Sequence, residues 1–106
     1  MSEIRDPESE SRQALADTAR ALESLGSPVR LEIYRLLVKT GPKGLAVGEI
    51  QHQLEIAGST LSHHISHLVQ NHLVHQIREG RVLRCHANYQ RMNQLIRFLS
   101  EECCSG

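Results

Sequence analysis

Two cysteines, Cys103 and Cys104, stand side by side at the end of the run NYQRMNQLIRFLSEECC, in which apolar residues recur with helical spacing. Adjacent thiols can bind a soft metal or metalloid, or they can undergo redox chemistry. The chain holds one further cysteine, Cys85, and an odd number of thiols argues against a framework of structural disulfides. We therefore expect thiol or metalloid chemistry at the adjacent pair.

Composition and charge describe the domain that must position this pair. The 106 residues suffice for one domain with a modest, aliphatic core, because the chain has one Phe, two Tyr and no Trp. Residues 1–26 hold three arginines and six acidic residues, a net charge of −3. Residues 27–87 hold seven basic and four acidic residues, a net charge of +3. An acidic beginning and a basic body predict an anionic partner for the body.

The beginning of the chain shows no signal-peptide pattern, and no stretch approaches the roughly 18 apolar residues of a membrane span. We therefore expect a cytoplasmic protein without membrane contact, in which the thiols are reduced. The opening segment MSEIRDPESES is polar and lacks periodicity. It predicts a mobile arm over residues 1–10, followed by a single domain over residues 11–106.

Two helices are expected at the start of this domain. Apolar residues at intervals of three or four predict the first helix over residues 11–25, which either packs on its own domain or forms a dimer contact. The second helix has a clear start, because Ser27 can cap it and Pro28 fits the first helical position. It ends near Thr40, since the following Gly41 is a typical stop.

The remainder of the chain predicts two short helices, a hairpin and a last helix. Residues 47–54 and 58–71 show helical spacing, and a tight connection joins them. Residues 73–78 and 82–87 then alternate with period two around Gly80, which is typical of a hairpin. The last helix has one apolar face, formed by Met92, Leu95, Ile96, Leu99 and Cys103. The fold class is therefore mainly α with a small β-hairpin, in the order ααααββα.

Two short helices followed by a basic hairpin are typical of a winged helix-turn-helix, in which the second helix enters the major groove of DNA. Arg81 beside the glycine at the hairpin tip is the first choice for a phosphate or groove contact, and alternation prevents Arg78, Arg81 and Arg84 from all pointing the same way. The alternative is an ordinary polar helix surface. The candidate DNA-binding residues are Ser59, Thr60, Ser62, His63, His67, Arg78 and Arg81.

The segments SLGSPVRLEIYRLL, GSTLSHHISHLVQNHLV and REGRVLRCHA resemble the ArsR family of small winged-helix repressors over about residues 20–102. The recognition helix carries the Ser-x-His pattern of that family as Ser62 and His64. The resemblance implies a homodimer joined through the first and last helices. It also implies a repressor that leaves its operator DNA when an inducer binds, usually a metal or a metalloid.

The ending LSEECC resembles that of the arsenic-responsive members whose thiols follow the last helix. The cysteines typical of other members are missing from residues 47–54, and the last helix lacks the spaced Asp and His set of zinc and nickel sensors. The resemblance therefore implies that Cys103 and Cys104 bind trivalent arsenic as the inducer, with no obligatory cofactor.

The number of sulfurs available decides the form of the arsenical. An arsenite centre takes three sulfurs and a methylarsenite centre takes two. Cys85 is expected to be a buried core thiol, and the last helix separates it from the pair by more than about 20 Å. A third sulfur would have to come from a partner subunit, glutathione or residues beyond Gly106.

Other interpretations of the cysteines and histidines stay open. A redox switch is disfavoured because the neighbouring Glu101 and Glu102 oppose thiolate formation. A zinc site would need two more ligands, and a purely structural role would make the cysteines small apolar residues at the end of a dimer helix. His63 and His67 are spaced to chelate a metal, but they share the expected DNA face.

Two broader classes of function also remain. We expect no enzyme, because the chain has no set of nucleophile, base and orienting group, no phosphate loop and no complete metal motif. A constitutive DNA-binding protein without an inducer is the other alternative.

Overall fold

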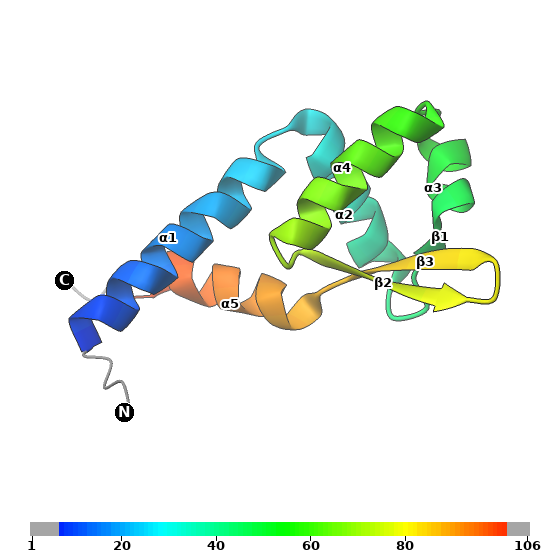
Figure 1. Cartoon of the computed structure of the whole chain (residues 1–106). Helices are drawn as coiled ribbons and strands as arrows, with labels where there is room; N and C mark the ends of the chain where they lie inside the picture. Colours follow the sequence, from blue (N-terminus) through cyan, green and yellow to red (C-terminus); the bar gives the residue numbers. More distant parts are fainter. Residues whose placement is uncertain (1–6, 102–106) are drawn as a thin grey trace, which may run out of the picture.

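The computed structural model describes residues 7–101 and confirms the predicted winged helix-turn-helix (Figure 1). Three strands form one antiparallel sheet in the order β1-β3-β2, and the helices pack on and around it. The elements are α1 (Pro7–Leu25), α2 (Pro28–Thr40), β1 (Leu45–Ala46), α3 (Val47–Leu54), α4 (Gly58–Gln70), β2 (Val74–Glu79), β3 (Val82–Ala87) and α5 (Tyr89–Ser100).

Helix α1 starts earlier than the sequence predicted. It begins at Pro7, so residues 7–10 of the predicted arm are helical, and residues 1–6 lie outside the described part of the chain. Proline is well suited to a first helical turn, and Glu8 and Glu10 favour the positive end of the helix dipole. The Arg12 guanidinium also contacts the Glu8 carboxylate at 2.9 Å. The spacing of apolar residues could not predict this earlier start, because residues 7–10 are all polar or proline.

Helix α2 has the boundaries that the sequence predicted. The Ser27 hydroxyl accepts a hydrogen bond from the backbone N–H of Arg30 at 3.4 Å, and Pro28 occupies the first helical position. Gly41 ends the helix with a φ of +87°, a conformation that favours glycine.

Replacing Ser27 with alanine should lower the free energy of unfolding by about 0.5–2 kcal/mol, because one N–H at the start of α2 loses its acceptor. Urea denaturation followed by circular dichroism measures this change. Ser66→Ala, at an exposed position within α4, is the matched control and should leave stability nearly unchanged. Equal denaturation midpoints for Ser27→Ala and the wild type would contradict the cap.

Strand β1 is an element that the sequence analysis missed. Leu45 pairs with Cys85 and Ala46 with Arg84 on β3, so the hairpin gains a third, very short strand. Two residues are too few to show an alternating pattern. The preceding Gly44 has a φ of +65°, and a Cβ there would meet the Cys85 carbonyl and lie 2.7 Å from the His86 ring. Only glycine lets the two segments come this close.

The core lies between α2, α3, α4 and the inner face of the sheet, and it is aliphatic as predicted. Leucine and isoleucine side chains dominate it, with the Cys85 thiol fully buried among them. The fully buried large side chains are Ile33, Leu37, Ile50, Leu61, Leu68 and Leu73.

The hairpin and the last helix largely follow the prediction. β2 and β3 pair from Val74↔Ala87 to Glu79↔Val82, and Gly80 turns the tip with a φ of +63°. Helix α5, however, ends at Ser100, and Glu101 leaves the helical conformation with a ψ of 135°. The predicted apolar face is described as far as Leu99 on α5, and its predicted continuation to Cys103 is not tested. Both Cys103 and Cys104 lie outside the described residues.

Candidate nucleic-acid interface

Helices α3 and α4 form a tight helix pair. The connection begins at Glu55, which adopts a left-handed conformation with a φ of +53° and so turns the chain abruptly. Leu61, Ile65 and Leu68 bury one side of α4 against the core. This burial fixes which side of α4 faces solvent, as a recognition helix requires.

The predicted contact residues Ser59, Thr60, Ser62 and His63 are all exposed on α4. Two further exposed polar residues, Ser66 and Gln70, lie on the same helix and were not predicted. They follow Ser62 at successive intervals of four, so the helical period could have identified them. The solvent side of α4 is therefore a continuous polar surface over more than two turns, and we call these six residues the polar face of α4.

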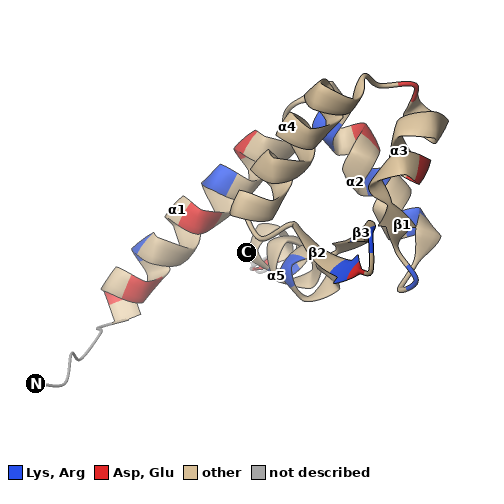
Figure 2. Cartoon of the chain, turned by 45° about the vertical axis from the view of Figure 1, so that its right-hand side comes forward, with Lys and Arg blue, Asp and Glu red and all other residues tan. Residues whose placement is uncertain are grey.

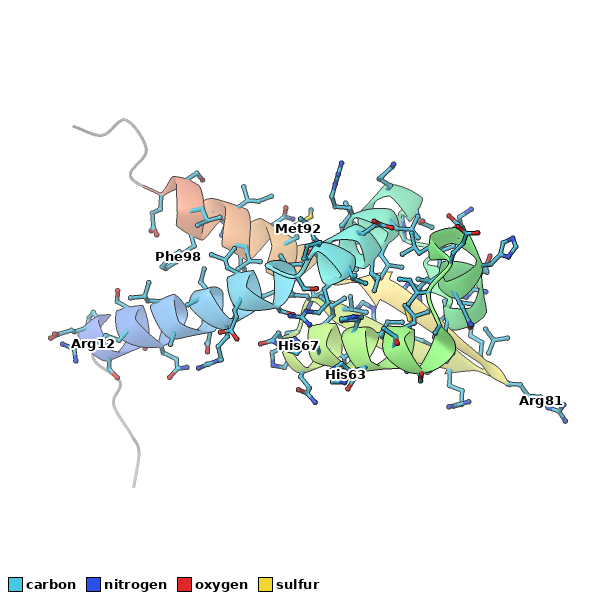
Figure 3. The ribbon with its side chains drawn as sticks, turned by 90° about the horizontal axis from the view of Figure 1, so that it is seen from above. Arg12, His63, His67, Arg81, Met92 and Phe98 are labelled. Carbon is cyan, nitrogen blue, oxygen red and sulfur yellow. The ribbon has the colours of Figure 1, made fainter. Side chains whose placement is uncertain are left out.

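His67, the fifth predicted contact residue on α4, lies beside the polar face and not within it. It is half-buried, and its Nδ1 lies 2.9 Å from the hydroxyl of Ser24 near the end of α1. Figure 3 shows His63 and His67 along α4. The helical period placed His67 on the outer face, but the contact with α1 turns part of its ring toward the domain. His64 is half-buried too, with Nδ1 3.4 Å from Arg30 Nη1.

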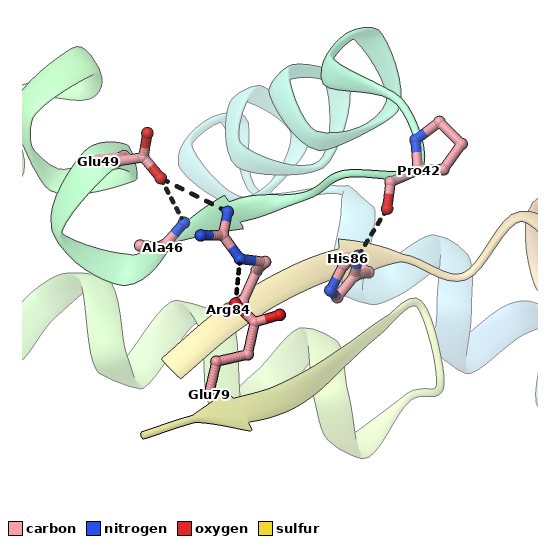
Figure 4. Close-up of polar contacts among 6 residues, drawn as sticks. All are labelled: Pro42, Ala46, Glu49, Glu79, Arg84 and His86. Atoms are coloured by element: carbon pink, nitrogen blue, oxygen red, sulfur yellow. Dashed lines mark hydrogen bonds and ion pairs between the residues drawn. The ribbon is translucent and has the colours of Figure 1, made fainter. Parts of the chain in front are cut away.

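The arginines of the hairpin fall into two groups. Arg78 and Arg81 are exposed, and Arg81 extends from the tip (Figure 3). Arg84 is half-buried, donates to Glu79 at 2.8 Å and pairs with Glu49 of α3 at 3.7 Å (Figure 4). The hydrogen bond that Arg84 donates to Glu79, together with the negative charges of the Glu79 and Glu49 carboxylates, raises the pKa of Arg84. The expectation that the three arginine side chains do not all point the same way is confirmed. Arg78 and Arg81 are exposed and can bind an anion from outside the domain.

A groove of about 680 Å³ runs between α4 and the hairpin. Ser62, Ser66 and Gln70 line it from α4, and Arg78 and Arg81 line it from the hairpin. Both arginines are therefore next to the polar face of α4. Figure 2 shows the acidic residues that recur along α1, away from this groove.

The described thiol and the histidines form no metal site in the structure. Cys85 is fully buried, its Sγ accepts a hydrogen bond from Gln76 Nε2 at 3.4 Å, and burial raises the pKa of the thiol. This confirms the predicted core position. Across residues 7–101, no three His, Cys, Asp or Glu side chains gather in a way that could hold a metal ion. In the same part of the chain, the helices are too short or too polar to cross a bilayer.

A family model described as a helix-turn-helix domain matches residues 25–77, which is half of the chain. The chain belongs to this helix-turn-helix family. The matched segment runs from the end of α1 through α4 into β2, so it contains the polar face of α4. Helix-turn-helix domains bind DNA through the second helix of the pair, which here is α4.

Solved structures resemble this helix-turn-helix chain over most of its length. HlyU from Vibrio cholerae is 26% identical with a TM-score of 0.68, covering 84% of this chain and 94% of its own. An ArsR-like transcriptional regulator from Rhodococcus sp. is 22% identical with a TM-score of 0.72, covering 83% of this chain and 80% of its own.

A third structure is the homodimeric winged helix-turn-helix DNA-binding domain of Mb0332 from Mycobacterium bovis, described as a possible ArsR-family regulator. It is 24% identical with a TM-score of 0.69, covering 98% of this chain and 94% of its own. The resemblance to the Rhodococcus and Mycobacterium structures shows the fold alone. No curated protein matches the sequence.

Proposed function

We propose that this protein is a homodimeric transcriptional repressor that leaves its operator when trivalent arsenic binds Cys103 and Cys104. The observation that carries DNA binding is the polar face of α4 beside Arg78 and Arg81, in a chain of the helix-turn-helix family. Helix α4 enters the major groove, where hydroxyl and imidazole groups reach base edges, and the hairpin arginines neutralise phosphates.

The exposed apolar side chains of α1 and α5 support a homodimer. The two helices lie side by side (Figures 1 and 3), and four of their large apolar side chains face solvent. The exposed fractions are 58% for Leu15, 40% for Leu22, 56% for Ile96 and 61% for Leu99. A cluster of this kind is typical of a protein interface. A two-fold dimer would read a near-palindrome with half-sites about one helical turn or more apart.

The position of the cysteines in the chain supports their coupling to this dimer. Cys103 follows Ser100, the last residue of α5, by three positions in the sequence. An arsenical bound there would be attached to the chain directly after a helix of the proposed dimer surface. We infer that the dimer has two geometries, of which only one binds DNA well. The arsenical weakens DNA binding because it binds the DNA-competent geometry less tightly than the other one.

Replacing both Cys103 and Cys104 with serine should leave operator affinity unchanged and abolish release by arsenite and methylarsenite. Couplings of this kind weaken binding about 5- to 150-fold, so the loss is measurable by fluorescence anisotropy of labelled DNA. Cys85→Ala is the matched control and should retain release, because that thiol is buried away from ligands.

Each inducer in the same assay distinguishes one alternative. Release of the double-serine variant by arsenicals would overturn the site. Release of the wild type by peroxide but not by arsenicals would favour the redox sensor, and release by zinc alone would favour a zinc site. DNA binding that none of these reagents alters would favour the protein without an inducer.

A further inference from the structure

Two histidines of α4 are held by residues outside the polar face. For His67, the side-chain nitrogen Nδ2 of Asn71 lies 2.9 Å from the His67 carbonyl oxygen and 3.4 Å from its Nδ1. The carbonyl oxygen accepts only, so the amide must turn its nitrogen toward it. That same nitrogen donates, so an Nδ1 of His67 that carries no proton suits its position. The Ser24 hydroxyl, 2.9 Å from Nδ1, can then donate to the same lone pair.

His64 is constrained by a different donor. Its Nδ1 faces the Arg30 guanidinium at 3.4 Å, and a guanidinium has no acceptor. Arg30 is itself held in place, because its Nε donates to the Ser24 carbonyl at 2.7 Å near the end of α1. Burial, followed by the charge of Arg30, lowers the pKa of His64, so the ring is neutral at physiological pH. Its proton must therefore sit on Nε2.

In an imidazole ring, Nδ1 and Nε2 point in widely different directions. When Nδ1 faces the domain and accepts a hydrogen bond, Nε2 carries the proton and points away from that partner. Both rings are half-exposed rather than enclosed. Each histidine thus has one nitrogen engaged with α1, α2 or the end of α4, and one N–H directed elsewhere.

We propose that Asn71, Ser24 and Arg30 are positioning residues, which set the tautomers of His67 and His64 so that each presents an Nε2–H donor to DNA. Such a donor fits hydrogen-bond acceptors, namely phosphate oxygens, guanine O6 and N7 or thymine O4, and it is mismatched to the amino groups of adenine and cytosine. The contact with DNA rests on the proposed function, whereas the tautomers are a property of the protein alone.

The tautomers are tested first, without DNA. Long-range 1H–15N correlation spectra of the full chain at pH 8 should show the proton of His64 and His67 on Nε2. Asn71→Asp places an acceptor-only carboxylate at Nδ1 of His67, so the proton should move to Nδ1. Asn93→Asp, on the exposed surface of α5, is the matched control and should leave both rings unchanged. A wild-type His67 with its proton on Nδ1 would overturn the proposal, whether or not the protein binds DNA.

The DNA contact is tested with a duplex selected for binding in vitro. Ser24→Ala and His67→Ala should each lower affinity about tenfold, and the double variant should lose little more than either one. Additive losses would show that Ser24 acts only on the fold and would overturn its positioning role. Ser24→Thr keeps the hydroxyl and should restore affinity. Circular dichroism confirms that each variant is folded.

Modified DNA then identifies the acceptor. Replacing guanine with 7-deazaguanine removes N7, replacing it with 2-aminopurine removes O6, and replacing thymine with 5-methyl-2-pyrimidinone removes O4. Methylphosphonate linkages remove phosphate acceptors. The wild type should lose affinity for one of these duplexes, and His67→Ala should lose markedly less. If no modification distinguishes the wild type from His67→Ala, the contact between His67 and DNA is refuted.

Discussion

Replacing Gly44 with alanine is expected to destabilise the domain far more than replacing Gly80 with alanine. Both glycines have nearly the same positive φ, +65° and +63°, so alanine suffers the same backbone penalty of roughly 1–2 kcal/mol at each position. At Gly80 the added Cβ meets nothing within 4 Å. At Gly44 it meets the backbone carbonyl of Cys85 and the ring of His86. Relieving that overlap costs roughly a further 1–3 kcal/mol.

The difference between these two variants isolates the overlap from the backbone strain. Urea denaturation of both variants and the wild type gives the two free energies of unfolding. The amide signals of β1 and β3 should shift in Gly44→Ala, because the overlap pushes these strands apart. Equal destabilisation of the two variants would show that β1 does not approach β3 as closely as described.

Replacing both Arg78 and Arg81 with glutamine should weaken DNA binding about 10- to 100-fold at moderate salt. The two arginines are the exposed cations of the hairpin, since Arg84 is engaged by two carboxylates. Each lost phosphate contact should also lower the slope of log K against log salt by about 1. The loss should be similar for different DNA sequences, because phosphates carry no sequence information.

Arg12→Gln is the matched control for the hairpin arginines. Arg12 is an exposed arginine on α1, far from Arg81 (Figure 3), and its replacement should change neither affinity nor salt slope. Anisotropy titrations over a range of salt concentrations measure both quantities. An unchanged slope for the double variant would show that the hairpin does not contact phosphates.

The sequence predicted most elements because their ends carry local signals. Ser27 with Pro28 at the start of α2, and Gly41 at its end, mark boundaries that depend only on neighbouring residues. Gly80 identifies the hairpin tip in the same way. β1 has no such signal, because its two residues become a strand only by pairing with β3, about 40 positions later.

The candidate site was less predictable, because contacts between distant residues decide how its side chains point. The helical period placed Ser62 and His63 on the outer face of α4, and both are exposed. The same period placed His67 there, but Ser24, 43 residues earlier, holds one side of its ring. Alternation indicated that the hairpin arginines differ, yet only the folded chain shows that Glu49 of α3 pairs with Arg84.

The two ion pairs of Arg84 have a consequence for the choice of operator. Glu79 belongs to the hairpin and Glu49 to α3, so one guanidinium fastens the wing to the helix pair (Figure 4). Glu49 is anchored in turn, because its carboxylate accepts the backbone N–H of Ala46 at 2.9 Å. Arg84 thus links the wing directly to α3, which leads into the recognition helix α4. Under the proposed DNA-binding mode, this link sets the distance between the bases that α4 contacts and the phosphates that the wing contacts. A base pair inserted between those two contacts in the operator should therefore weaken binding.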